Sequence, residues 1–182
     1  MLRDDPTVPA TRSGVVPADD LAAFVDSWPG VAATLVDRHL NVTGASPLST
    51  ALFPRLTPGV NLALALFLEV VPAGTCRSAD EIGYQLVAAL HASLAWHEDD
   101  PAFERLVGEL STMSREFSTA WAAPRRELRP HGVVRTTHPT AGDLAIGYQL
   151  IELAAGANDV LIVWSAADAS SEPGFASLVA TR

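Results

Sequence analysis

Two consecutive helix start signals between residues 99 and 121 constrain the fold of this chain more than any other feature of its sequence. Asp100 precedes a proline, which is typical of an N-cap followed by proline at the first helical position, and apolar side chains recur behind it at helical spacing. Ser114 starts a second helix in which Phe117 and Trp121 share one face, because residues four apart are neighbours on a helix. This stretch predicts two short helices that present two aromatic side chains together.

The helix upstream of this stretch has its own start signal. The segment Ser78–Glu81 matches a capping box, and leucine and isoleucine follow it at four-residue steps, so we expect a helix that runs to about His97. In the helix that starts at Asp100, Gly108 costs about 1 kcal/mol relative to alanine. We therefore expect another element to pack closely against Gly108.

Three further helices are predicted nearer the N-terminus and in the middle of the chain. Residues 61–69 are apolar nearly all round, which fits a buried strand or a buried helix, and Asn61 as N-cap favours the helix. Asp19 starts an earlier helix that ends before Pro29, and Ser46 caps a short helical turn with proline at its first position.

After Arg129 the apolar period changes from that of a helix to that of a strand. The second strand of this region alternates so that Tyr148 lies on its inner face. An N-terminal hairpin is predicted as well, and a short helix ends the chain. The predicted strands are Val31–Val36, Leu40–Thr43, Val133–His138, Leu144–Leu150 and Val160–Ala166, and the final helix is Phe175–Val179.

Strands from both ends of the chain are expected to form one sheet around a helical middle. The predicted fold class is α+β, with an antiparallel sheet of about five strands and a helical layer inserted between the second and third strands, covering the inner face. Residues 19–182 are expected to form a single domain, because about 100–200 residues suit one domain. Residues 1–18 have no apolar period and are expected to be a disordered leader.

Composition excludes several classes of function. All twelve basic residues are arginine, so Schiff-base chemistry and a lysine-bearing phosphate loop are excluded. A net charge of −9 argues against nucleic acid binding by this chain, and the cluster Arg125, Arg126 and Arg129 is interpreted as a solvated turn. No apolar run reaches the roughly 18 residues that cross a bilayer. Single Cys76 fits a reducing compartment, and we expect a cytoplasmic protein without a membrane partner.

The sequence contains no recognisable metal-binding or catalytic pattern. His91 and His97 are six residues apart and point in different directions around a helix, so they cannot share a metal ion. The acidic run from Glu98 to Asp100 is explained by helix capping, and no Gly-x-Ser-x-Gly nucleophile motif occurs. We expect no catalytic residue, no metal and no cofactor, and therefore no enzyme.

What remains is a set of aromatic residues spread over helices and strands that are predicted to face one interior. An ordinary packed core is one interpretation. A pocket is the other, because small-molecule sites are mostly apolar with few polar anchors. The aromatic set is Phe53, Phe67, Trp96, Phe117, Trp121, Tyr148 and Trp164.

Several segments together resemble the MmyB-like ligand-binding domain, which stands behind an N-terminal helix-turn-helix in bacterial transcription regulators. The resemblance covers about Leu21 to Ala166, and residues 99–121 are its most specific part. One departure is Pro124-Arg125-Arg126, where the family usually has His-Asp-Val. The matching segments are Pro29-Gly30, Leu52-Phe53, Asn61-Leu62, Leu66-Phe67, Asp99-Asp100-Pro101, Leu106–Ser111, Ser114, Glu116-Phe117, Trp121, His138-Pro139, Gly142, Leu144 and Tyr148.

This resemblance implies a PAS-like sensor fold around an apolar cavity for a small, lipid-like ligand such as a fatty acid. We expect a non-enzymatic sensor that acts through protein association, without the DNA-binding domain, as a homodimer or as a heterodimer with a helix-turn-helix regulator. The alternative is a ligand-free interaction module that dimerises with full-length helix-turn-helix relatives. Phe67, Phe117, Trp121, Tyr148 and Trp164 are predicted to line the cavity, and Arg135 and His138 to meet a polar head group.

Overall fold

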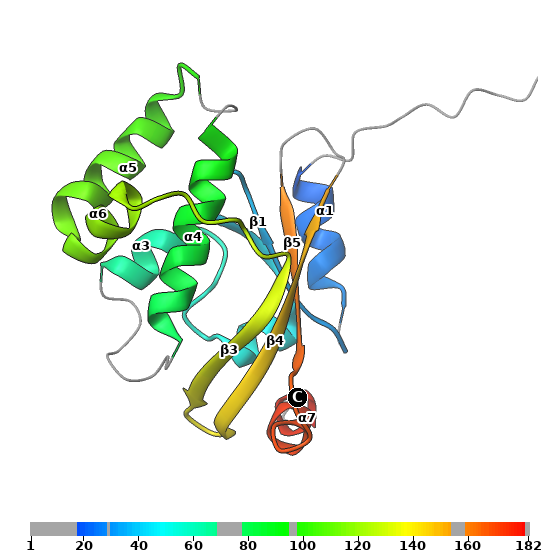
Figure 1. The fold of residues 1–182 in the computed structure, drawn as a ribbon. Helices are drawn as coiled ribbons and strands as arrows, with labels where there is room; N and C mark the ends of the chain where they lie inside the picture. The colour runs from blue at the N-terminus through cyan, green and yellow to red at the C-terminus, as the bar shows by residue number, and fades with distance from the viewer. Residues whose placement is uncertain (1–17, 29, 69–77, 95–97, 154–158, 181–182) are drawn as a thin grey trace, which may run out of the picture.

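The computed structural model describes residues 18–28, 30–68, 78–94, 98–153 and 159–180. Cys76, Trp96, His97 and nearly all of the predicted leader therefore lie outside the described residues. The elements in chain order are α1 (Ala18–Asp26), β1 (Ala32–Val36), β2 (Val42–Ala45), α2 (Pro47–Leu52), α3 (Leu62–Phe67), α4 (Ala79–Ser93), α5 (Pro101–Met113), α6 (Arg115–Ala122), β3 (His131–His138), β4 (Gly142–Glu152), β5 (Val160–Ala166) and α7 (Glu172–Ala180) (Figure 1).

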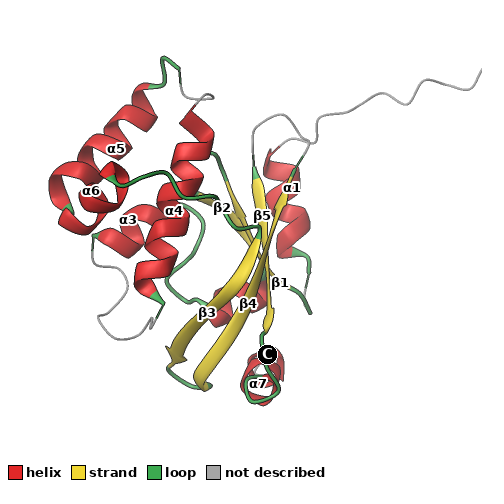
Figure 2. Cartoon of the chain, viewed as in Figure 1, coloured by secondary structure: helices red, strands yellow, loops and turns green. Residues whose placement is uncertain are grey.

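The five strands form one antiparallel sheet in the order β2-β1-β5-β4-β3 (Figure 2). β5 pairs with β1 on one side and with β4 on the other, so Trp164 stands between Ala32 and Tyr148 across three strands. Strands from both ends of the chain thus meet in one sheet, and five helices, α2 to α6, are inserted between β2 and β3. The α+β prediction is confirmed.

Both faces of the sheet carry helices. On the outer face, Val25 of α1 packs with Ala33, Leu35 and Leu161. On the inner face, α2 and α7 cover one end of the sheet, and the first residue of α3, Leu62, packs near its other end. All five residues of β1 are buried, because helices cover this strand from both sides. The sequence predicted helices on the inner face only, whereas the structure also places α1 on the outer face (Figure 1).

Helices α3 to α6 form a helical unit beside the inner face (Figure 1). Phe117, Leu90 and Leu110 are each 0% exposed at its centre. Three of its four predicted N-caps are confirmed, because each of these side chains accepts a hydrogen bond from a backbone N–H group at the start of its helix. These caps are Asn61 for α3, Asp100 for α5 and Ser114 for α6.

Ser78 does not cap α4 as the sequence predicted. Its backbone lies at φ −106° and ψ 19°, and its side chain makes no capping hydrogen bond. Instead, its hydroxyl oxygen accepts a 3.1 Å hydrogen bond from the backbone N–H of Arg135 in β3, and Glu81 binds Arg129. Both side chains of the capping box are therefore used for contacts with the chain around β3.

Two other local predictions need correction. Gly108 is exposed, and no atom lies within 4 Å of the position where a Cβ would stand, so the expected close packing there is wrong. The first strand of the N-terminal hairpin lies where it was predicted to within one residue, but the second begins two residues later, at Val42, because Asp37 organises the turn. Its carboxylate accepts hydrogen bonds from the backbone N–H groups of His39 and Asn41, both 2.8 Å long, and Leu40 adopts φ 67°.

Candidate functional site

Three of the predicted site residues meet in one aromatic column within the helical unit. The rings of Phe67 and Phe117 make an edge contact with centroids 5.3 Å apart, and Phe117 stacks on Trp121 at 5.6 Å. The column ends at His91 of α4, whose ring lies 4.1 Å from that of Trp121. We call these four residues the aromatic column. Because Phe117 is 0% exposed, its ring is core, whereas Phe67 and Trp121 on either side of it are only partly buried.

His91 opens onto a cleft of about 700 Å³ between the helical unit and the sheet. We call it the α4–β4 cleft. One wall is α4, the second is the α6–β3 linker (residues 123–130), and the third is the end of β4. Its lining residues are Ala88, His91 and Ala92 of α4, Arg125, Arg126, Glu127, Leu128 and Pro130 of the linker, and Leu150 and Glu152 of β4.

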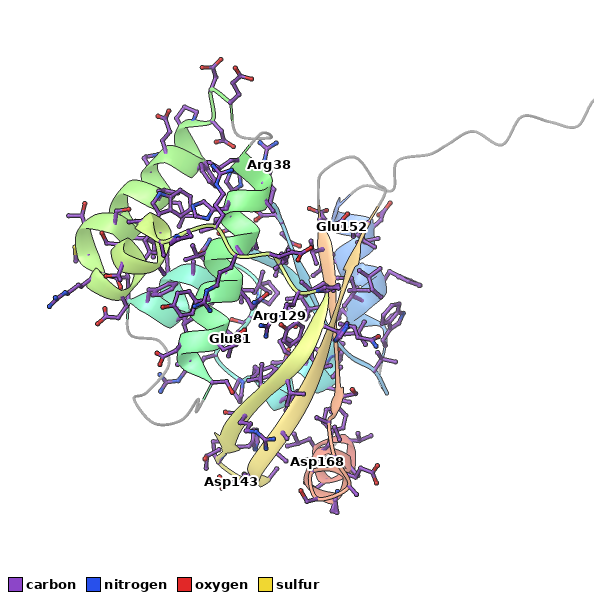
Figure 3. The ribbon with its side chains drawn as sticks, in the orientation of Figure 1. Arg38, Glu81, Arg129, Asp143, Glu152 and Asp168 are labelled. Carbon is purple, nitrogen blue, oxygen red and sulfur yellow. The ribbon has the colours of Figure 1, made fainter. Side chains whose placement is uncertain are left out.

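The α6–β3 linker is attached to the first half of α4. The backbone N–H of Arg129 donates a 2.8 Å hydrogen bond to Gln85 Oε1, and its guanidinium forms a 2.9 Å ion pair with Glu81. The guanidinium of Arg126 lies 3.7 Å above the ring centre of Tyr84 and 3.9 Å from Glu81. Glu81 and Arg129 lie between α4 and the sheet in Figure 3. These contacts hold the linker over α4, so that it forms a wall of the cleft.

Charged groups of both signs line the cleft. Arg125 and Arg126 supply the positive charges, Glu127 and Glu152 supply the negative ones, and His91 is the remaining titratable side chain of the lining. Burial, followed by the positive charge of Arg125, lowers the pKa of His91 below its ordinary value of 6.5. Within the described residues, no ion pair joins Arg125 to an acidic side chain. Arg125 therefore keeps its donors available to a bound group.

Tyr148 and Trp164, the predicted site residues of the sheet, lie together on its inner face. Their ring centroids are 6.4 Å apart, and Trp164 also makes an edge contact with Phe53 at 4.7 Å. The indole N–H of Trp164 donates a 3.0 Å hydrogen bond to Thr34, so its polar atom is satisfied within the protein. Tyr148 precedes the cleft residue Leu150 by two positions and shares its face of the strand.

Tyr148 lies across the backbone of β3. A Cβ added to Gly132, its cross-strand partner, would stand 2.7 Å from the tyrosine ring, so only glycine leaves room for the ring there. Burial raises the pKa of Tyr148, the negative charge of Glu81 raises it further, and Arg129 acts in the opposite direction. The phenol therefore stays protonated and can donate a hydrogen bond.

The structure does not bring Arg135 and His138 to this cleft. Pro130 lines the cleft, and His138 lies eight residues further along the chain, at the far end of β3. At about 3.3 Å per residue this separation is roughly 26 Å. His138 is 7% exposed. Its Nε2 donates a 2.9 Å hydrogen bond to the carbonyl of Ala51, and its Nδ1 accepts hydrogen bonds from two backbone N–H groups.

The sequence predicted other roles for the polar residues that line the cleft. Arg125 and Arg126 were interpreted as part of a solvated turn, and His91 was considered only as a metal ligand. A usable signal was present in α4: Ala88 and Ala92 are small, four residues apart, and on the same helix face as His91. Small side chains beside a histidine leave space on a helix surface.

A second, smaller cleft of about 320 Å³ lies between α3, α5 and the β1–β2 turn. His39 Nε2 is 2.8 Å from Asp100 Oδ2 there, and Asn61 donates hydrogen bonds to the carbonyl of His39 and the side chain of Asn41. These polar groups already bind one another, so this cleft has a structural role. In the described part of the chain, no cluster of three or more His, Cys, Asp or Glu residues is arranged to hold a metal ion.

The family model described as the MmyB-like transcription regulator ligand binding domain matches residues 17–178, which is nearly the whole chain. No curated protein matches the chain. Among the described residues, no helix is both long and apolar enough to span a membrane.

Proposed function

The chain belongs to the family of MmyB-like transcription regulator ligand binding domains, and on that basis we propose that its α4–β4 cleft binds a small molecule with an apolar body and an anionic group. The observation that supports this most is the lining, in which Ala88, Leu128 and Leu150 offer apolar surface beside Arg125 and Arg126. A volume of about 700 Å³ lies within the range of about 300–1,000 Å³ that is usual for small-molecule sites.

Arginine suits the anionic end of such a ligand. A guanidinium binds a carboxylate through two parallel N–H···O hydrogen bonds, which fixes the orientation of the ligand as well as its position. Arg126 is partly engaged by Tyr84 and Glu81. Arg125 is therefore the leading candidate to bind the head group of the ligand. In this proposal Arg125 and Arg126 have the role that the sequence predicted for Arg135 and His138.

The predicted aromatic residues have graded roles in this proposal. Trp121 flanks the cleft through His91 on the helical side, and Tyr148 flanks it beside Leu150 on the sheet side. Phe67 and Phe117 support Trp121 from within the core, and Trp164 supports Tyr148. A ligand thus meets the ends of two aromatic groups rather than a cavity enclosed by all five rings.

Helix α4 connects the cleft to other parts of the domain. Its second half lines the cleft, while its first half binds the α6–β3 linker, and Ser78 at its start binds β3. We infer that a ligand which moves the linker or α4 changes the surface that both present to a protein partner. In this view the domain is a non-enzymatic sensor that acts through protein association.

A ligand-free interaction module is the second candidate. Two observations favour it: Phe117 is completely buried in a packed core, and Val133 and Ile151 are 47% and 44% exposed on the outer face of β3 and β4. Such a module dimerises through an apolar surface, because exposed apolar patches mark association sites. This candidate is ruled out if the protein stays monomeric in sedimentation at all accessible concentrations and also has no effect on DNA binding by a full-length helix-turn-helix relative.

The sensor proposal is tested with two probes of equal chain length, decanoate and 1-decanol. Native mass spectrometry of the purified chain should show a one-to-one decanoate complex, and decanoate at 100 times its Kd should add about 2.7 kcal/mol to the free energy of unfolding. Arg125→Gln should weaken decanoate binding by about tenfold or more, since a hydrogen bond to a charged group contributes about 1.5–3 kcal/mol.

Arg115→Gln is the matched control, because Arg115 is exposed on α6 and is not part of the cleft lining. It should bind decanoate as the unmodified protein does. The proposal fails if neither probe binds, or if both arginine variants lose the same affinity. In the second case the effect would reflect net charge rather than a site at Arg125.

A further inference from the structure

His91 joins two features that the proposed function leaves separate, the aromatic column and the α4–β4 cleft. Its imidazole lies 4.1 Å from the ring of Trp121 at an interplanar angle of 33°, and the same side chain lines the cleft. No other residue of the column lines the cleft. A change in the charge of His91 therefore acts on the ligand site and on the packed interior at the same point.

The charges of the cleft lining balance while His91 is neutral. Arg125 and Arg126 supply two positive charges, and Glu127 and Glu152 supply two negative ones. Arg126 is also close to Glu81, so its charge is partly compensated from outside the lining. The lining acquires a net positive charge only when His91 binds a proton. An anionic ligand and an uncharged ligand should therefore respond differently to the state of His91.

Partial burial, followed by the positive charge of Arg125, lowers the pKa of His91 and so favours its neutral form near physiological pH. An anion bound at Arg125 removes that repulsion and supplies an attractive charge. The face of Trp121 also tolerates the protonated ring, because a cation within about 6 Å of an aromatic centroid is attracted to it. Binding of an anion and uptake of a proton by His91 should therefore favour each other, by linkage.

We propose that His91 sets the charge specificity of the α4–β4 cleft: an anionic amphiphile binds together with a proton taken up by His91, whereas an uncharged one binds without it. This inference rests on the proposed function, because it requires that the cleft binds a ligand. The charged groups that line the cleft together with His91 are Arg125, Arg126 and Glu127 from the linker and Glu152 from β4. From α6, its neighbour is Trp121, which does not titrate.

The test uses 1-decanesulfonate, which stays ionised throughout the range from pH 5.5 to 8, with 1-decanol as the uncharged probe. Calorimetric titration of the full chain should show the decanesulfonate Kd falling by about tenfold from pH 8 to pH 5.5, since one unit of pKa change corresponds to a tenfold change in affinity. Titrations in buffers of different ionisation enthalpy should show uptake of up to one proton. The decanol Kd should not change with pH.

Two variants isolate His91. His91→Gln removes the titrating group, and His91→Phe keeps a ring against Trp121 if the first variant folds poorly. Each should bind decanesulfonate with a Kd that does not change with pH and that equals the value of the unmodified protein at pH 8. His131→Gln is the control, because His131 is exposed on β3 and does not line the cleft, and it should keep the full pH dependence.

The outcomes separate this inference from the proposed function. If decanesulfonate binds the unmodified protein equally at all pH values, or if both His91 variants keep the pH dependence, the inference is overturned and the binding cleft stands. If the decanol Kd changes as much as the decanesulfonate Kd, the inference is likewise overturned. If neither probe binds at any pH, the proposed function itself fails.

Discussion

Substituting Phe117 by leucine tests whether the aromatic column is packed core. Phe117 is 0% exposed and contacts the rings of Phe67 and Trp121. Two aromatic contacts contribute about 0.5–1.5 kcal/mol each beyond area burial. The smaller side chain also loses roughly 1 kcal/mol of transfer free energy. We therefore expect Phe117→Leu to lower the free energy of unfolding by about 2–4 kcal/mol.

The measurement is urea unfolding followed by circular dichroism, with the slope m compared between variants, because an unchanged m shows that stability alone has changed. In a thermal scan the loss corresponds to a Tm lower by about 4–16 °C for a chain of this size. Phe24→Leu is the matched control, since Phe24 is 58% exposed and makes one ring contact, with Trp28. It should change stability by less than about 1 kcal/mol.

A loss below about 1 kcal/mol for Phe117→Leu, or equal losses for both variants, would refute the reasoning, because typical buried aromatic truncations cost more. Decanoate binding provides a second readout. Because Phe117 supports Trp121 without reaching the cleft, its leucine variant should retain the decanoate affinity once the folded fraction is accounted for. A loss of affinity that exceeds the loss of folded protein would place Phe117 in contact with the ligand.

Three further predictions concern single positions. Gly108→Ala should stabilise the protein by about 0.5–1 kcal/mol, because the site is exposed and open. Gly174→Ala should destabilise it by about 1–3 kcal/mol, because the added Cβ would lie 2.7 Å from Leu144 and 3.0 Å from the Ala141 carbonyl. Urea unfolding of the two variants should therefore show changes of opposite sign in the free energy of unfolding. Asp100→Ala should cost about 1–2 kcal/mol through loss of the α5 cap, with Glu98→Ala as an exposed control near zero. Burial, followed by the negative charge of Asp37, raises the pKa of Asp159. The ionised carboxylate therefore destabilises the fold at neutral pH, and this cost disappears as the pH falls through the folded-state pKa. Asp159→Asn should stabilise the protein against urea at pH 7 and lose that advantage near pH 4.

Most of the helical caps could be predicted from sequence because a capping side chain acts over two or three residues. Asn61, Asp100 and Ser114 each bind the helix that follows them, and each was predicted. Ser78 has the same local pattern but binds Arg135, which lies 57 positions away in sequence. Nothing local reports such a contact, so the capping box was a reasonable but wrong prediction.

The site was harder to predict than the fold because it depends on how three separated segments meet. The aromatic residues were recognised by their size and spacing, but the sequence does not reveal that Phe117 is core while Trp121 meets His91. The cleft forms where the α6–β3 linker crosses α4, and this crossing is set by Glu81, Gln85 and Arg129. Those contacts join residues more than forty positions apart.

The hydrogen bond from Arg135 to Ser78 also affects how copies of this protein meet one another. β3 is the outermost strand on its side of the sheet, and a long strand in that position normally offers its backbone to any extended chain that approaches. Here the start of α4 occupies the amide near the middle of that row. A foreign strand would have to displace the helix before it could pair along the whole of β3. Replacing Ser78 by alanine should therefore promote fibrillar aggregation at high protein concentration while the soluble fold remains.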